Sequence, residues 1–310
     1  MFYPIQKLEN RVNELDRLRY RDIRGIDSFN LYEPQQGKEN TPPEGYSDQK
    51  MKVNDTWSGR DKYLWLNTFL SIPEGWEGKK PVIYLDLGRT GGGNNSGFES
   101  LLYVNEKPFQ GVDSNHKEVI LPAEDSLDIS IQLWSGLEGG GQPANQYYRL
   151  KEAWWGYLDE KVDDLYFKSK AILDSIKQQD EHEPNRSIVL AILNRAFHEI
   201  DWSDIGSEAF YQSLYAARSV LLHEMEKLPK YSDVTIHATG HSHIDLAWLW
   251  RTKHTKEKAR RTFYTVLRLM ELYPDYTFLQ SQPQLYEWVK EEDPELFSMG
   301  FSSINSGPWR

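Results

Sequence analysis

The spacing of apolar residues changes period along this chain, and a chain of mixed period cannot fold as one uniform class. Near the start, apolar residues recur at the spacing of one helix face, at Ile5, Leu8, Val12 and Leu15. From about residue 57 to residue 150 the period is two, as in Leu127, Ile129, Ile131 and Leu133. This alternation predicts half-buried strands. After residue 150 the helical spacing returns, as in Phe210, Leu214, Ala217 and Leu221, with Ser207 as the expected N-cap.

A third pattern begins near residue 233. Residues 234–239 predict a strand, a helical stripe follows that contains Phe263 and Met270, and residues 276–279 predict a second strand. Strand, helix and strand in about fifty residues are typical of a βαβ unit and therefore of a parallel sheet. Glycine clusters at 91–97 and 139–141 are expected to be turns rather than phosphate loops, because no Gly-Lys-Ser/Thr follows them.

These patterns predict a multidomain α+β protein. At 310 residues the chain exceeds the ~250–300 residues at which a single core stops growing. The expected parts are an N-terminal helix and linker (1–50), a jelly-roll-like β-sandwich domain (51–150), a helical connector (151–230), and the beginning of a parallel α/β, β/α-barrel-like catalytic domain (231–310).

Composition excludes several classes of function. There are no cysteines, so disulfides, iron–sulfur clusters and cysteine nucleophiles are excluded. With 36 basic and 47 acidic residues the net charge is −11, which argues against a nucleic-acid partner. The N-terminus lacks a signal peptide pattern, and no apolar run approaches the ~20 residues of a membrane span. We therefore expect a cytoplasmic protein with no membrane partner.

The segment from Gly240 to Trp250 carries the candidate chemistry, because ligands gather at the carboxyl ends of parallel strands. In an extended chain His243 and Asp245 point the same way while Ile244 faces the protein. An imidazole and a carboxylate suit a divalent ion such as Zn²⁺. The alternative is a hydrogen-bonded structural pair or a surface turn.

Four further aromatic side chains lie near this pair in the sequence. His241 can orient a metal ligand from behind or make a turn hydrogen bond, and the turn is favoured. His237 is expected to be a core residue of the predicted strand. Trp248 can stack on a sugar ring or pack in the core, whereas packing is favoured for Trp250. Packing is also expected for most tryptophans of the β-domain, which are Trp57, Trp65, Trp76 and Trp134.

Three runs of sequence, 241–250, 260–274 and 278–288, together resemble the start of the catalytic domain of α-mannosidases of glycoside hydrolase family 38. Upstream, residues 103–105, 110–116 and 134–141 resemble the β-rich N-terminal domain of the cytosolic and bacterial branch of that family. The resemblance covers most of residues 50–297. It implies a retaining exo-α-mannosidase that uses one zinc-like ion and acts on mannose-containing oligosaccharides. By the same resemblance His243 and Asp245 are metal ligands, and Trp248 lines the sugar pocket.

The resemblance also implies two catalytic carboxyl groups, a nucleophile and an acid/base, which have no counterpart in this sequence. We therefore expect no catalytic residue here and a truncation or shifted reading frame near Ser298, where the charged helical pattern is lost. The alternatives are a non-catalytic glycan-binding β-domain protein and another metal-dependent carbohydrate hydrolase, such as a deacetylase. An unfinished sheet leaves strand edges open, so a homo-oligomer is a further hypothesis.

Overall fold

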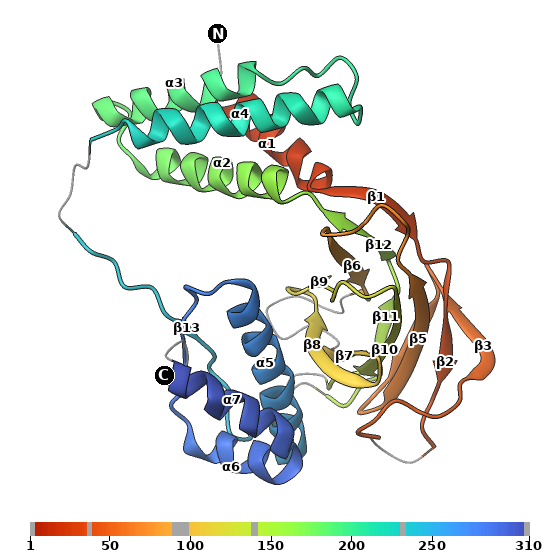
Figure 1. Ribbon diagram of the computed structural model, residues 1–310. Helices are drawn as coiled ribbons and strands as arrows, with labels where there is room; N and C mark the ends of the chain where they lie inside the picture. The colour runs from red at the N-terminus through yellow and green to blue at the C-terminus, as the bar shows by residue number, and fades with distance from the viewer. Residues whose placement is uncertain (1–3, 36–38, 89–98, 138–141, 230–233, 307–310) are drawn as a thin grey trace. The chain divides into compact units, whose positions relative to one another are not determined.

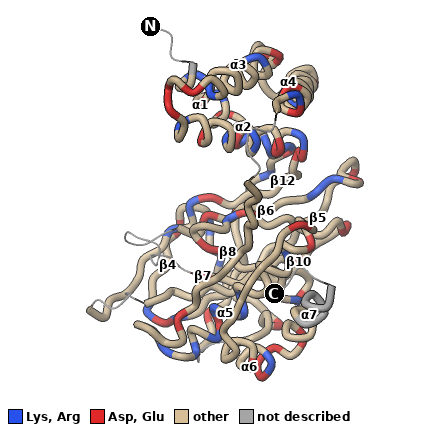
Figure 2. Tube along the Cα trace, turned by 90° about the vertical axis from the view of Figure 1, so that its left-hand side faces the viewer, with Lys and Arg blue, Asp and Glu red and all other residues tan. Residues whose placement is uncertain are grey.

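A computed structural model describes residues 4–35, 39–88, 99–137, 142–229 and 234–306, with backbone only for 301–306 (Figure 1). The glycine clusters predicted as turns at 91–97 and 139–141 lie outside these ranges. The chain forms two compact units. The helical unit comprises Met1–Ile23, Trp76–Pro81 and Gly156–Thr235; the β-rich unit comprises Arg24–Gly75, Val82–Trp155 and Ile236–Arg310. Acidic and basic residues are interspersed along the chain in both units (Figure 2).

Helix α1 leads the helical unit, whose other long helices come from residues beyond 156. The four helices are α1 (Pro4–Leu18), α2 (Glu160–Gln178), α3 (Pro184–His198) and α4 (Glu208–Glu226). Their core includes the apolar faces predicted from sequence, with Leu8, Val12 and Leu15 of α1 packed in one cluster with Leu193 and Leu214. As predicted, Ser207 caps α4, because its hydroxyl accepts from the Phe210 backbone N–H over 3.1 Å.

In the described part of the chain, twelve strands precede residue 160. They are β1 (Tyr20–Gly25), β2 (Ser28–Tyr32), β3 (Ser47–Lys52), β4 (Thr56–Gly59), β5 (Tyr63–Ser71), β6 (Lys80–Asp86), β7 (Glu99–Val104), β8 (Lys107–Asp113), β9 (Glu118–Ile120), β10 (Ser126–Trp134), β11 (Gln146–Arg149) and β12 (Glu152–Leu158). They form antiparallel pairs such as β10 with β5. The largest sheet has six strands in the order β3-β2-β5-β10-β7-β8, and a second has four in the order β1-β12-β6-β9. Residues 47–52 form β3, although the sequence places them at the end of a linker.

Strand β10 is buried more fully than its alternation predicts. The apolar residues that predicted it are buried, namely Leu127, Ile129, Ile131 and Leu133. The alternate residues Ser130, Gln132 and Trp134 are buried as well. Their face is covered because the Trp134 ring lies 4.5 Å from the His254 ring and the Ser130 hydroxyl contacts that of Tyr46. The sheet therefore has a second packed face, which holds the C-terminal elements.

The C-terminal elements contain a short parallel pair and three helices. They are β13 (Gly240–His241), α5 (Thr252–Leu272), β14 (Phe278–Leu279), α6 (Pro283–Glu292) and α7 (Pro294–Ser306). The predicted parallel pairing is confirmed, with Gly240 opposite Phe278. The predicted position of the first strand is wrong, because the described chain forms no strand over 234–239 and Ile236 is 85% exposed. Helix α7 continues through Ser298, so the backbone stays helical where the charged pattern ends.

The predicted α+β class is confirmed. The predicted barrel-like arrangement is not seen, because these elements form no closed barrel in the described residues. Among the same residues, no helix is both long enough and apolar enough to cross a membrane.

Candidate metal and sugar site

The candidate ligands lie in an irregular segment between β13 and α5. His243 Nε2 and Asp245 Oδ1 are 3.1 Å apart, and their side chains are 78% and 41% exposed. Between them, Ile244 is 1% exposed and belongs to the core beneath α5. The i, i+2 alternation thus sends two donor groups outward and one apolar side chain inward, as expected for an extended segment.

The chemistry of this donor pair fits a divalent cation. An imidazole nitrogen and a carboxylate oxygen, exposed and adjacent, are two of the ligand types that Zn²⁺ prefers. A structural zinc site needs four ligands, and a catalytic one needs three from the protein. Within the described ranges, no group of three or more His, Cys, Asp or Glu side chains is placed to hold a metal ion. The pair by itself therefore offers fewer protein ligands than either kind of zinc site needs.

Two tryptophans follow the pair and differ in their surroundings. Trp248 is 56% exposed, and its ring meets the Trp250 ring edge-on at 5.7 Å. Trp250 is partly buried and donates through Nε1 to Thr255 Oγ1 over 2.8 Å, which agrees with the packing role favoured for it. The Trp248 ring is thus accessible to solvent, and it follows Asp245 by three residues in the sequence.

The other histidines of the segment lie elsewhere. His237 is exposed in a segment without regular structure, so the expected core role is wrong, because the strand that would have buried it is absent. His241 is exposed and lines a cavity of about 330 Å³ between β8 and α5, which His116, Asp113 and Lys258 also line. His116 makes a local turn contact, with Nδ1 3.0 Å from Asp113 Oδ1. That hydrogen bond raises the pKa of His116, although burial opposes it.

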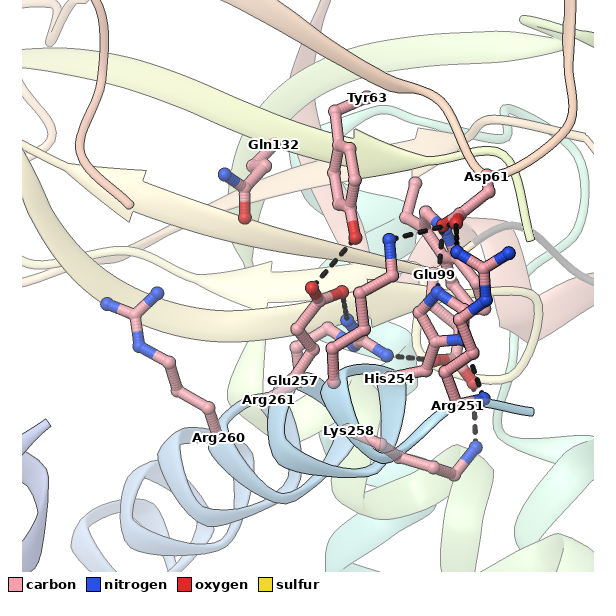
Figure 3. A network of polar contacts seen from close by, with 12 residues as sticks. Asp61, Tyr63, Glu99, Gln132, Arg251, His254, Glu257, Lys258, Arg260 and Arg261 are labelled. Carbon is pink, nitrogen blue, oxygen red and sulfur yellow. Dashed lines mark hydrogen bonds and ion pairs between the residues drawn. The ribbon is translucent and has the colours of Figure 1, made fainter. Parts of the chain in front are cut away.

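Asp61, in the turn before β5, anchors the first turn of α5 (Figure 3). Its carboxylate accepts from His254 Nε2 at 2.8 Å and Trp134 Nε1 at 3.0 Å, and pairs with Lys253 Nζ at 2.8 Å. Burial by itself would raise the pKa of Asp61, but the donors from Lys253, His254 and Trp134 outweigh it and lower the pKa. Sequence analysis missed this carboxylate, since its partners lie far away along the chain.

The middle of α5 is held by further buried charge. Tyr63 donates to Glu257 over 2.7 Å, and Glu99 pairs with Lys258 at 2.7 Å and with Arg261 (Figure 3). Burial, with the Glu257 carboxylate beside it, raises the pKa of Tyr63 far above its ordinary value. Farther along α5, Arg260 pairs with Asp293 at 2.6 Å.

The basic residues of 253–261 do not all lie on a solvated face of α5. The side chains of Arg260 and Arg261 are only 14% and 12% exposed. Buried charges are ordinarily paired, so their burial is explained by the acidic partners that face them.

The β-domain tryptophans are packed as expected, since Trp65, Trp76 and Trp134 are buried. Trp57 is partly buried, and its ring stacks on Tyr148 at 6.0 Å. Three of the four therefore offer no open aromatic surface to a sugar.

Comparisons with known proteins find similarity to one family of glycosyl hydrolases and to α-mannosidases. Residues 233–310 match the family described as "Glycosyl hydrolases family 38 N-terminal domain". The Homo sapiens protein "Alpha-mannosidase 2C1" is 29% identical over 263 residues, covering 80% of this chain and 24% of the relative. "Alpha-mannosidase G" of Dictyostelium discoideum is 25% identical over 265 residues, covering 79% of this chain and 23% of the relative.

The chain thus spans about a quarter of the length of the curated relatives it matches. Among solved structures, an "Uncultured Clostridium sp. Beta-glucuronidase" superposes with a TM-score of 0.34 at 12% identity, over 45% of this chain and 29% of that one. A likeness at that level carries no argument.

Proposed function

We propose that this chain, which belongs to glycosyl hydrolase family 38 through residues 233–310, forms part of a metal-dependent retaining α-mannosidase acting on terminal α-mannosyl residues of glycans. The observation that carries the proposal is the convergence of His243 Nε2 and Asp245 Oδ1, 3.1 Å apart and exposed, within the matched residues. A cytosolic location and mannose-containing oligosaccharides as ligands belong to the same proposal.

In this proposal His243 and Asp245 bind one divalent ion, with Zn²⁺ the best fit to a nitrogen and an oxygen donor. Such an ion polarises and orients substrate oxygens when it is bound. His243 and Asp245 hold their donor atoms toward solvent, while the burial of Ile244 keeps the backbone between them in place.

Trp248 supplies the apolar contact that a sugar ring needs. The less polar face of a pyranose packs on an aromatic ring, and Trp248 is 56% exposed three residues after Asp245. We assign the same mannosyl residue to this ring and to the ion, so binding of a mannoside depends on both.

Retaining hydrolysis requires two carboxyl groups about 5–5.5 Å apart, one to attack and one to protonate the leaving oxygen. We assign no residue of this chain to either role. Because the chain matches about a quarter of each curated relative, the proposal places both groups in the remainder of such a protein. This chain alone is therefore proposed to bind a mannoside rather than to hydrolyse it.

The experiment titrates the 310-residue chain with methyl α-mannoside, with and without Zn²⁺, following tryptophan fluorescence and calorimetric heat. Methyl α-galactoside serves as the control ligand. We expect weak, saturable mannoside binding that requires Zn²⁺ and that His243→Ala and Asp245→Asn abolish. Mannoside binding that survives both substitutions and a chelator would contradict the metal role, and equal binding of the galactoside would contradict the substrate class.

A further inference from the structure

The segment that carries His243 and Asp245 has no regular secondary structure to hold it. Strand β13 ends at His241, and residues 242–251 precede the first turn of α5. Ala247 in this segment has a φ of +98°, a backbone conformation that is strained for any residue other than glycine. Other contacts must therefore maintain the geometry of the donor pair.

Side chains from two neighbouring elements bind three carbonyl groups of this segment. After β14, Gln280 Nε2 donates to the Ser242 carbonyl at 3.2 Å and to the Ser242 hydroxyl at 3.1 Å. Gln282 Nε2 donates to the Ile244 carbonyl at 2.8 Å. The backbone on the amino-terminal side of His243 and between His243 and Asp245 is thereby fixed.

The third carbonyl is bound from α5. Thr255 Oγ1 donates to the Asp245 carbonyl at 3.2 Å, and its own position is set by the hydrogen bond from Trp250 Nε1. Thr255 is fully buried. The carbonyls of 242, 244 and 245 are therefore bound while the side chains of His243 and Asp245 are left outward.

Gln280 is itself held in place through its backbone. It is 4% exposed, and its backbone carbonyl accepts from the Tyr286 hydroxyl at 2.7 Å. Buried amides that donate to backbone carbonyls are costly to remove, because the carbonyl then loses its partner in a place water reaches poorly.

We propose that Gln280, Gln282 and Thr255 are positioning residues that hold His243 and Asp245 as a preorganised nitrogen–oxygen donor pair. Their role toward a metal rests on the proposed function, whereas the geometry they impose does not. None of the three contacts the ion or the sugar; each acts through a backbone carbonyl of the segment. Residues that orient metal ligands in this way usually contribute about 10–100-fold to metal affinity.

The test compares Gln282→Met and Thr255→Val, which remove one donor each at similar volume, with the control Gln284→Met. Gln284 is exposed on α6 two positions from Gln282. The first readout uses the metal-free chain with labelled histidine, and measures the nuclear Overhauser effect between the His243 ring and the Asp245 β protons. We expect it in the parent and in the control, and expect it to be lost or much weakened in the two test variants.

The second readout is Zn²⁺ affinity, measured by competition with a chromogenic chelator, together with the visible spectrum of bound Co²⁺. We expect Gln282→Met to weaken Zn²⁺ binding by about tenfold and to alter the Co²⁺ spectrum, with an unchanged circular dichroism spectrum. Wild-type Overhauser intensity in both test variants would overturn the inference. Unchanged Zn²⁺ affinity in His243→Ala would instead overturn the proposed function, and the metal-free readout would still decide the inference.

Discussion

His254 and Asp61 are joined by a 2.8 Å hydrogen bond, although they lie 193 positions apart and the His254 side chain is only 2% exposed. The other ring nitrogen, Nδ1, faces the backbone N–H of Arg251 at 3.3 Å and accepts from it. A ring that accepts at Nδ1 and donates at Nε2 is neutral. Burial lowers the pKa of His254 more than the Asp61 carboxylate raises it, which agrees with this neutral tautomer.

This relationship predicts how stability depends on pH. Below the ordinary histidine pKa of 6.5 the unfolded chain binds a proton at His254 before the folded chain does, so the free energy of unfolding falls as pH decreases through that region. The lowered pKa of Asp61 acts with the same sign below its ordinary value of 3.8. Thermal unfolding of the parent and of His254→Gln between pH 7.5 and 5 checks this. We expect a shallower pH dependence in the variant, and parallel curves would contradict the neutral ring.

Removing the Glu99 carboxylate that pairs with Arg261 should weaken the packing of α5 against β7. Glu99→Gln leaves Arg261, 12% exposed, without its nearest acidic partner, and we expect a loss of about 1–3 kcal/mol in the free energy of unfolding. Urea denaturation measures it. Glu106→Gln, at an exposed position of the β7–β8 turn, is the matched control. Equal denaturation midpoints for the two variants would rule out a stabilising role for Glu99.

Gly111 allows β8 to pack close against α5. A Cβ at Gly111 would lie 2.9 Å from Thr265 Oγ1, which now accepts from the Gly111 N–H at 3.0 Å. We expect Gly111→Ala to cost about 1–3 kcal/mol, as overpacking usually does. Gly45→Ala is the control, since nothing lies within 4 Å of its added Cβ. Adding Thr265→Ala to Gly111→Ala should recover part of the melting temperature; a further loss would argue against the contact.

Substitution of Trp248 should separate ligand binding from folding. Because its side chain is 56% exposed, we expect Trp248→Ala to change stability by less than about 1 kcal/mol, yet to weaken Zn²⁺-dependent mannoside binding at least several-fold. Calorimetry with methyl α-mannoside measures the second effect. Tyr147→Ala removes an aromatic side chain that is 68% exposed on β11 and should leave mannoside binding intact. Equal binding by both variants would remove Trp248 from the site.

The sequence by itself determined the features that depend on neighbours along the chain. Helical spacing identified the buried face of α4 and its Ser207 cap, since side chains three and four apart share a face whatever surrounds them. The two-residue period likewise predicted that Ile244 points inward between His243 and Asp245.

Only the tertiary structure decided which of these segments have partners. Residues 234–239 have the composition of a strand, yet in the described part of the chain they form none, and a strand exists only where its backbone groups join a ladder. Gln282 and Asp61 likewise acquire their roles from groups that folding brings within about 3 Å, a distance that spacing along the chain does not encode.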